Sequence, residues 1–190
     1  MINLFRNMAS AQGRKNMKKG KSNLVLVGMP AVGKSTVGVI LAKELGYQFL
    51  DSDLLIQQKE GKLLKDIIAC KGTEGFISVE NMVNASIEAK RSVIATGGSV
   101  VYGKEAMAHL REIGEIIYLK ISYACLEKRL HNLRGRGVVL RKGQTLHDIY
   151  EERTVLYEKY ADYIVDVNEK GIEETLEEIL ALVKERIRKS

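Results

Sequence analysis

The segment GMPAVGKST, residues Gly28 to Thr36, decides the fold of this chain of 190 residues. It follows the apolar run LVLV at 24–27 and precedes a stretch with helical periodicity. Its glycines, Gly28 and Gly33, let successive backbone N–H groups turn toward one anion, and the start of the following helix adds a partial positive charge. A glycine-rich turn between a strand and a helix is therefore expected to bind a chain of phosphates.

The spacing of this segment is that of the P-loop, with Gly28, four further residues, and then Gly33-Lys34-Ser35. In that pattern the lysine contacts the β- and γ-phosphates, and the serine hydroxyl coordinates Mg²⁺. Pro30 is the only proline of the chain and is expected to stiffen the loop. The sequence thus predicts a bound nucleotide with Mg²⁺. The residues expected to contact the nucleotide are Gly28, Ala31, Val32, Gly33, Lys34, Ser35 and Thr36.

Beyond this loop, short apolar runs alternate with longer helical patterns. Strands are predicted at 24–28, 48–51, 92–96, 115–121 and 163–167. Helices are predicted at 34–45, 104–112, 124–133, 145–161 and 172–188, with two or three more in 53–90, broken near Gly61 and Gly72. Alternation of this kind predicts an α/β fold of three layers, in which helices cover a five-stranded parallel sheet. Ligands of such folds bind beyond the carboxyl ends of the strands.

The distribution of charge limits the classes of partner. The chain has a net charge of +6, but residues 1–22 contain six basic and no acidic residues, which leaves 24 of each sign in the remainder. We therefore expect a disordered basic extension at 1–22 and one domain at 23–190, without a nucleic-acid partner. An organellar transit peptide is the alternative interpretation of the extension.

Two further features of composition bear on location. No apolar run approaches the ~20 residues that cross a bilayer, so we expect no membrane partner. We also expect the protein to be cytoplasmic and monomeric. Cys70 and Cys125 stand far apart and have no metal-binding spacing. They are predicted to be buried thiols in a reducing compartment.

Two acidic residues, Asp51 and Asp53, follow the second predicted strand. Alternate residues of an extended segment point the same way, so both carboxylates are predicted to face the phosphate end of the site. One acid is then available to orient metal-bound water, and the other to take a proton from an attacking hydroxyl. The alternative is a helix N-cap beside a solvated acid, because aspartate also favours helix starts.

From about Asn23 to its end, the chain resembles the shikimate kinases, which are small single-domain P-loop kinases similar to nucleoside monophosphate kinases. The matching segments are GMPAVGKST, FLDSD, GTEGFISVE with Gly72, Phe76 and Glu80 at the family spacing, ATGG, and ERTVLYEKYAD. The resemblance implies a P-loop fold with a mobile lid at about 134–144. It also implies transfer of the γ-phosphate of ATP to the 3-hydroxyl of shikimate, a step of aromatic amino-acid biosynthesis.

The resemblance also implies roles on the acceptor side. Asp53 would contact the shikimate hydroxyls and act as the base. Gly97, Gly98 and Glu80 would line the acceptor pocket, and Arg153 would bind the carboxylate of shikimate.

On the nucleotide side, the resemblance places Asp51 near Mg²⁺ together with Ser35. Arg129 would lie against adenine. Arg136, in the lid, would reach the phosphates and join Lys34 in catalysis.

Three positions depart from the family pattern. Ile77 stands where an arginine usually binds the substrate carboxylate, Ser99 replaces a third pocket glycine, and Gly137 replaces a lid proline. A charge-assisted hydrogen bond contributes about 1.5–3 kcal/mol, so the loss of one weakens binding of an acid roughly 10- to 150-fold unless Lys62 or Lys65 substitutes.

Three hypotheses therefore remain at this point. The leading one is a shikimate kinase, and the second is a kinase of the same build that acts on another small polyol or hydroxy acid. The third is a nucleotide-binding module without transfer, against which the intact Lys34, Ser35, Asp51 and Asp53 argue.

Overall fold

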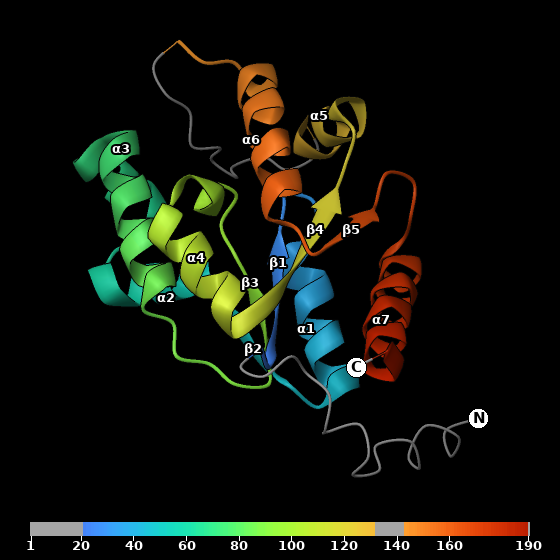
Figure 1. Cartoon of the computed structure of the whole chain (residues 1–190). Coiled ribbons are helices and arrows are strands. Elements are labelled where there is room, and N and C mark those ends of the chain that lie inside the picture. The colour runs from blue at the N-terminus through green and yellow to red at the C-terminus, as the bar shows by residue number, and fades with distance from the viewer. Residues whose placement is uncertain (1–20, 132–142, 190) are drawn as a thin grey trace.

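A five-stranded parallel sheet lies at the centre of the computed structural model, which describes residues 21–131 and 143–189 (Figure 1). The strand order is β2-β3-β1-β4-β5. The strands are β1 Asn23–Val27, β2 Gln48–Asp51, β3 Ser92–Ala95, β4 Gly114–Lys120 and β5 Tyr163–Asp166. The predicted α/β class with five parallel strands is therefore confirmed.

The central strand, β1, explains why the apolar run at 24–27 is continuous rather than alternating. It pairs with β3 on one side and β4 on the other, so that Leu24 lies opposite both Val93 and Glu115. Every residue of β1 is buried, which requires cover on both faces of the sheet. The carboxyl end of β1 leads directly into the P-loop, and the main hydrophobic core fixes its position.

Helices supply that cover. They are α1 Lys34–Leu45, α2 Ser52–Glu60, α3 Leu64–Ala85, α4 Lys104–Ile113, α5 Tyr123–His131, α6 Leu146–Tyr160 and α7 Ile172–Lys189, and a short 3₁₀ turn, η2, spans Val100–Tyr102. Helix α1 packs beside α7, and α3 packs beside α4 (Figure 1). Helix α3 is interrupted at Gly72, which has a φ of 70° and a ψ of 179°, so the predicted break there is confirmed.

The prediction that both cysteines are buried is wrong. Cys70 is exposed and Cys125 is only half-buried. Helix α3 packs through Ile67 and Phe76, which are buried, whereas Cys70 is exposed on the same helix. Spacing along the chain excluded a metal site, but it carried no information about which helix surface is covered.

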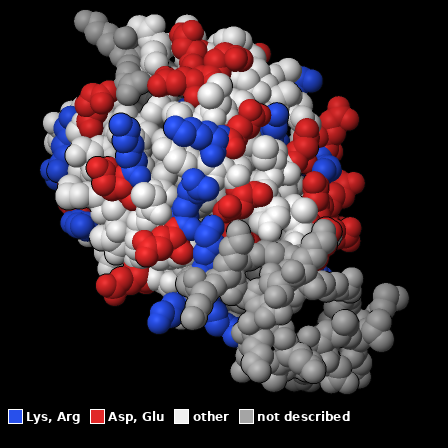
Figure 2. Space-filling model, in the orientation of Figure 1, with Lys and Arg blue, Asp and Glu red and all other residues white. Residues whose placement is uncertain are grey.

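Charge is evenly distributed over the face of the molecule shown in Figure 2, where lysine and arginine side chains intermingle with aspartate and glutamate. Within the described residues, no helix is long and apolar enough to span a membrane. Of the predicted basic extension, Lys21 forms an ion pair with Asp162 at 3.3 Å, and Ser22 N–H donates to the carbonyl of Ile113. The rest of that extension lies outside the described residues, as does most of the predicted lid, including Arg136.

Candidate active site

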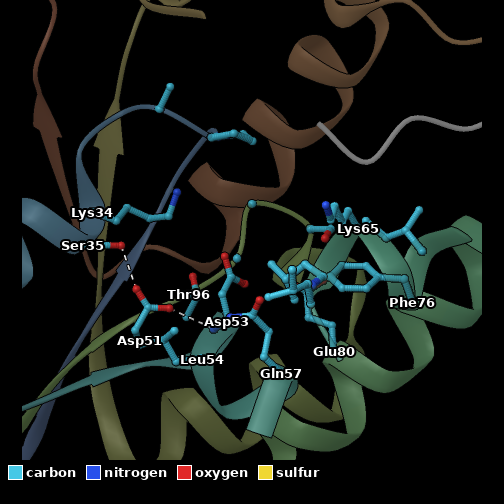
Figure 3. A pocket seen from close by; sticks show the side chains of 18 of the residues that line it. Lys34, Ser35, Asp51, Asp53, Leu54, Gln57, Lys65, Phe76, Glu80 and Thr96 are labelled. Carbon is cyan, nitrogen blue, oxygen red and sulfur yellow. Dashed lines mark hydrogen bonds between the residues drawn. The ribbon is translucent and has the colours of Figure 1, made fainter. Parts of the chain in front are cut away.

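A cavity of about 600 Å³ opens beyond the carboxyl ends of the strands, where the fold class predicts a ligand (Figure 3). The P-loop forms one wall and the start of α3 another, with the turn after β3 between them. The predicted site residues that line it are Ala31, Gly33, Lys34, Ser35, Thr36, Asp51, Asp53, Glu80, Gly97, Gly98 and Arg153. One cavity therefore collects residues from five separate segments of the sequence.

The P-loop backbone has the conformation that a phosphate cradle requires. Gly28, Ala31 and Gly33 have φ values of 145°, 65° and 102°. A side chain at Gly28 would also lie only 2.7 Å from the carbonyl oxygen of Leu119, so this position admits glycine alone. Gly33 caps α1 without a side-chain hydrogen bond, which leaves the first N–H groups of that helix available to an anion.

Lys34 is held inside this loop. Its side chain is only 8% exposed, and its Nζ donates to the carbonyl oxygens of Gly28 and Met29 at 2.7 and 2.9 Å. Burial lowers the pKa of the ammonium to about 8, although the negative charge of Asp53 opposes that shift. The positive charge thus lies where the P-loop pattern places the terminal phosphates.

Ser35, in the first turn of α1, and Asp51, at the end of β2, bring two side-chain oxygen atoms of the kind that coordinate metal ions close together. Ser35 Oγ donates to Asp51 Oδ2 at 2.8 Å (Figure 3). The other carboxylate oxygen of Asp51 accepts from the N–H of Asp53 at 3.0 Å, so Asp51 is also the N-cap of α2. The N-cap interpretation of Asp51 is therefore confirmed, and its role beside Mg²⁺ stays a prediction.

Asp53 reaches the cavity in a way that strand alternation did not predict. Residue 52 already belongs to α2, so Asp51 ends a strand and Asp53 lies in the first turn of a helix. The intervening Ser52 is buried, and its Oγ accepts the N–H of Gly97 at 3.3 Å. The two carboxylates share the cavity because the chain changes direction between them.

The glycine pair after β3 lets charged groups approach the backbone. A methyl group on Gly97 would lie 2.2 Å from Oε1 of Glu80 and 2.8 Å from Oδ1 of Asp53. One on Gly98 would lie 3.3 Å from a terminal nitrogen of Arg153 and closer still to the P-loop proline. Their φ values are ordinary, so it is space that favours glycine here: any larger residue would displace the carboxylates of Glu80 and Asp53 or the ring of Pro30.

Glu80 carries a buried carboxylate on this wall. It is 1% exposed, and neither oxygen has a hydrogen-bond partner among the described residues. Burial raises the pKa of Glu80 to about 7. The negative charge of Asp53 also raises this pKa, whereas the nearby hydroxyl of Ser99 lowers it. That hydroxyl is close to the carboxylate but does not form a hydrogen bond with it. A buried carboxylate without a hydrogen-bond partner is expected to accept a hydrogen bond from a ligand or from water.

Arg153 enters the cavity from α6, with its side chain 1% exposed. Its Nε donates to the hydroxyl of Tyr102 at 3.3 Å, and the guanidinium lies 5.2 Å from the centre of that ring. Tyr157, one turn further along α6, donates its hydroxyl to the carbonyl of Gly98 and stacks on Tyr118. Sequence reasoning missed both the bond of Tyr157 to the pocket turn and the contact of Tyr102 with Arg153.

Arg129 lies outside the wall that the described residues form. Its guanidinium donates to the carbonyls of Val32 and Val167 at 3.3 and 2.7 Å, and so ties the P-loop to the segment after β5. Contact with adenine stays a prediction for Arg129.

Apolar side chains from α2, from α3 and from the turn between them complete the wall of the cavity. Sequence reasoning did not assign them to the site. They are Leu54, Leu63, Leu64, Ile68 and Phe76.

A P-loop, the carboxylates of Asp51 and Asp53 and the buried Arg153 line one cavity at the end of a parallel α/β sheet. This combination defines a P-loop kinase of small molecules. Residues 30–184 match the shikimate kinase family model. The chain belongs to the shikimate kinase family.

Individual relatives agree with that assignment. Shikimate kinase 2 of Yersinia pseudotuberculosis is 34% identical over 75% of this chain and 85% of its own length. The shikimate kinase of Sulfurihydrogenibium sp. is 33% identical over 86% of this chain and 99% of its own. Among solved structures, shikimate kinase from Acinetobacter baumannii in complex with shikimate superimposes with a TM-score of 0.76 at 31% identity, covering 87% of this chain and 94% of that one.

Proposed function

We propose that this protein transfers the γ-phosphate of ATP to the 3-hydroxyl of shikimate. The observation that carries the proposal is that one cavity joins the P-loop lysine, Lys34, to Asp53 and Arg153 in a chain of the shikimate kinase family. The Acinetobacter baumannii relative, which has the same fold, is described with shikimate bound.

The nucleotide would bind with its phosphates on the P-loop. The N–H groups at the start of α1 and the ammonium of Lys34 face that position, and both stabilise negative charge. Ser35 and Asp51 fit Mg²⁺, because a hydroxyl and a carboxylate 2.8 Å apart are hard oxygen donors that leave room for phosphate oxygens and water. When bound, Mg²⁺ would neutralise charge on the phosphates.

The acceptor would bind on the other side of the cavity. Asp53 takes the proton of the attacking hydroxyl while the oxygen of that hydroxyl bonds to the γ-phosphorus and ADP leaves with the bridging oxygen. Arg153 would bind the carboxylate of shikimate, since Tyr102 already fixes its guanidinium. We assign Arg136 to the phosphates and Arg129 to adenine on the family pattern alone.

We propose one kinase domain at 23–190, monomeric and cytoplasmic, with a lid at about 134–144 and the basic segment 1–22 as an extension. The balanced charge of the domain argues against a nucleic-acid partner.

A second acceptor class is favoured by two positions. Ile77 is half-buried and, among the described residues, is not part of the cavity wall, whereas the hydroxyl-bearing Ser99 is. A neutral polyol would lose no binding energy through the absence of an arginine at position 77, and the hydroxyl of Ser99 would offer it a hydrogen bond.

The experiment that separates these candidates is an ADP-release screen with Mg-ATP. The panel contains shikimate, gluconate and a neutral polyol such as myo-inositol, with Asp53→Asn as the control for background hydrolysis of ATP. We expect kcat/KM for shikimate to exceed that for the other acceptors at least ~10-fold, the worth of one charge-assisted hydrogen bond. Higher kcat/KM for the neutral polyol would establish the second acceptor class instead.

A further inference from the structure

Three cations line the cavity in the part of the chain that the structure describes: Lys34, Lys65 and Arg153. Lys34 is bound to P-loop carbonyls, and Arg153 is buried against Tyr102. Lys65 is exposed, and no carboxylate of a described residue forms an ion pair with it. Its charge is therefore available to a ligand.

The position of Lys65 favours an anionic ligand. It lies in the first turn of α3, which begins at Leu64; the N–H of Leu64 donates to Oε1 of Gln57 at 3.3 Å, and Asp66 is the acidic residue of that turn. The partial positive charge of a helix start disfavours a cation there and favours an anion. A carboxylate in the cavity beside this turn would interact favourably with the ammonium of Lys65.

Figure 3 shows Lys65 beside Phe76, on the side of the cavity opposite Lys34 and Ser35. The P-loop side is reserved for phosphates, so an anion near Lys65 belongs to the acceptor. Asp53 lies between the two sides, where the attacking hydroxyl is required.

The structure also distinguishes Lys65 from Lys62, the other lysine near the acceptor side in the sequence. Lys62 lies in the turn before α3, and its Nζ is 3.9 Å from the sulfur of Cys70. Lys65 lines the cavity, whereas neither Lys62 nor Ile77 belongs to the wall formed by the described residues.

We propose that Lys65 supplies the second positive charge for the carboxylate of the acceptor, with Arg153 as the first. This inference rests on the proposed function, because it requires an acidic acceptor. It accounts for an apolar residue at position 77, since a cation from the first turn of α3, on the other side of the break at Gly72, serves the same carboxylate.

Steady-state kinetics at saturating Mg-ATP test the proposal. The enzymes are wild type, Lys65→Met, Lys65→Arg and Lys62→Met, and the acceptors are shikimate and its methyl ester, which lacks the negative charge. We expect Lys65→Met to raise KM for shikimate roughly 10- to 100-fold, the range of one lost charge-assisted contact. Its kcat, its KM for ATP and its KM for the methyl ester should change less than about threefold, because uniform binding of the carboxylate alone is removed.

The other variants separate a binding role from a structural one. Lys65→Arg keeps the charge and should keep KM for shikimate within about threefold, and Lys62→Met should behave as wild type. Melting curves check that each variant is folded.

The possible outcomes are distinct. A wild type that does not phosphorylate shikimate overturns the proposed function and this inference with it. An active wild type overturns the role of Lys65 alone if Lys65→Met keeps its KM for shikimate, or if it loses affinity equally for the acid and the ester.

Discussion

Replacing Glu80 with glutamine should stabilise the protein above neutral pH and leave it little changed in acid. The carboxyl is buried, and its pKa is raised from 4.5 to about 7 by that burial. An acid whose pKa is higher in the folded state stabilises the fold fully below pH 4.5, and this contribution is lost as pH rises through 7. At 1.36 kcal/mol per pKa unit the shift amounts to about 3 kcal/mol.

Glutamine has the same size as glutamate and does not titrate. About 2.5 kcal/mol of this contribution is lost between pH 5 and pH 8. The melting temperature of Glu80→Gln, compared with wild type, should therefore rise between these pH values by roughly 5–10 °C, at 2–4 °C per kcal/mol for a chain of this length. Thermal unfolding followed by circular dichroism at the two pH values measures this directly. Glu88→Gln, an exposed position just beyond α3, is the matched control and should follow wild type at both. A difference between Glu80→Gln and wild type that is the same at pH 5 and pH 8 would refute the reasoning.

Three further substitutions test the catalytic geometry. Lys34→Met should leave the circular dichroism spectrum intact and lower kcat at least ~10³-fold, because the ammonium stabilises charge on the terminal phosphates; near wild-type turnover contradicts its assignment. Asp53→Asn should lower kcat by roughly 10²–10⁴ while the Kd for ATP, measured by calorimetry, barely changes; weaker ATP binding with kcat preserved would place Asp53 with the metal instead. Gly97→Ala should lower both turnover and the melting temperature, since its methyl group would lie 2.2 Å from Oε1 of Glu80. Gly171→Ala is the control, because its methyl group would have no contact closer than 3.7 Å. A fully active Gly97→Ala enzyme would show that the pocket turn is not confined as described.

Local signals account for the parts of the fold that could be predicted most accurately. Helix α1 ends at Leu45 as expected, because Gly46 adopts the left-handed conformation with a φ of 64° that closes a helix. Helix α6 begins after Thr145, whose hydroxyl accepts from the N–H of Asp148 in a capping box. In each case the deciding interaction lies within four residues of the boundary.

The residues of the candidate site differ in how well the sequence predicts them. The P-loop spacing specifies a backbone conformation, so the sequence alone predicts the positions of Lys34 and Ser35 in the site. Glu80 and Arg153 carry no such pattern, and only the family resemblance singled them out before the structure placed both in one cavity.

What remained hidden depends on tertiary packing. The exposure of Cys70, the choice between Lys62 and Lys65, and the bond from Tyr157 to the pocket turn all follow from how α3 and α6 pack on the rest of the domain. Hydrophobic periodicity describes a helix face, but it does not say which neighbour covers that face or which side chain reaches a cavity.

The most direct test of the central claim is to identify the phosphorylated product. Wild type and Asp53→Asn are each incubated with Mg-ATP and shikimate, and the mixtures are analysed by proton–phosphorus correlation spectroscopy. The account predicts that wild type yields stoichiometric ADP and a phosphorus nucleus coupled to the ring proton at carbon 3, with no such signal from Asp53→Asn over the same time. Inorganic phosphate as the sole phosphorus product beside ADP, or a phosphate coupled to another carbon of the ring, would contradict it.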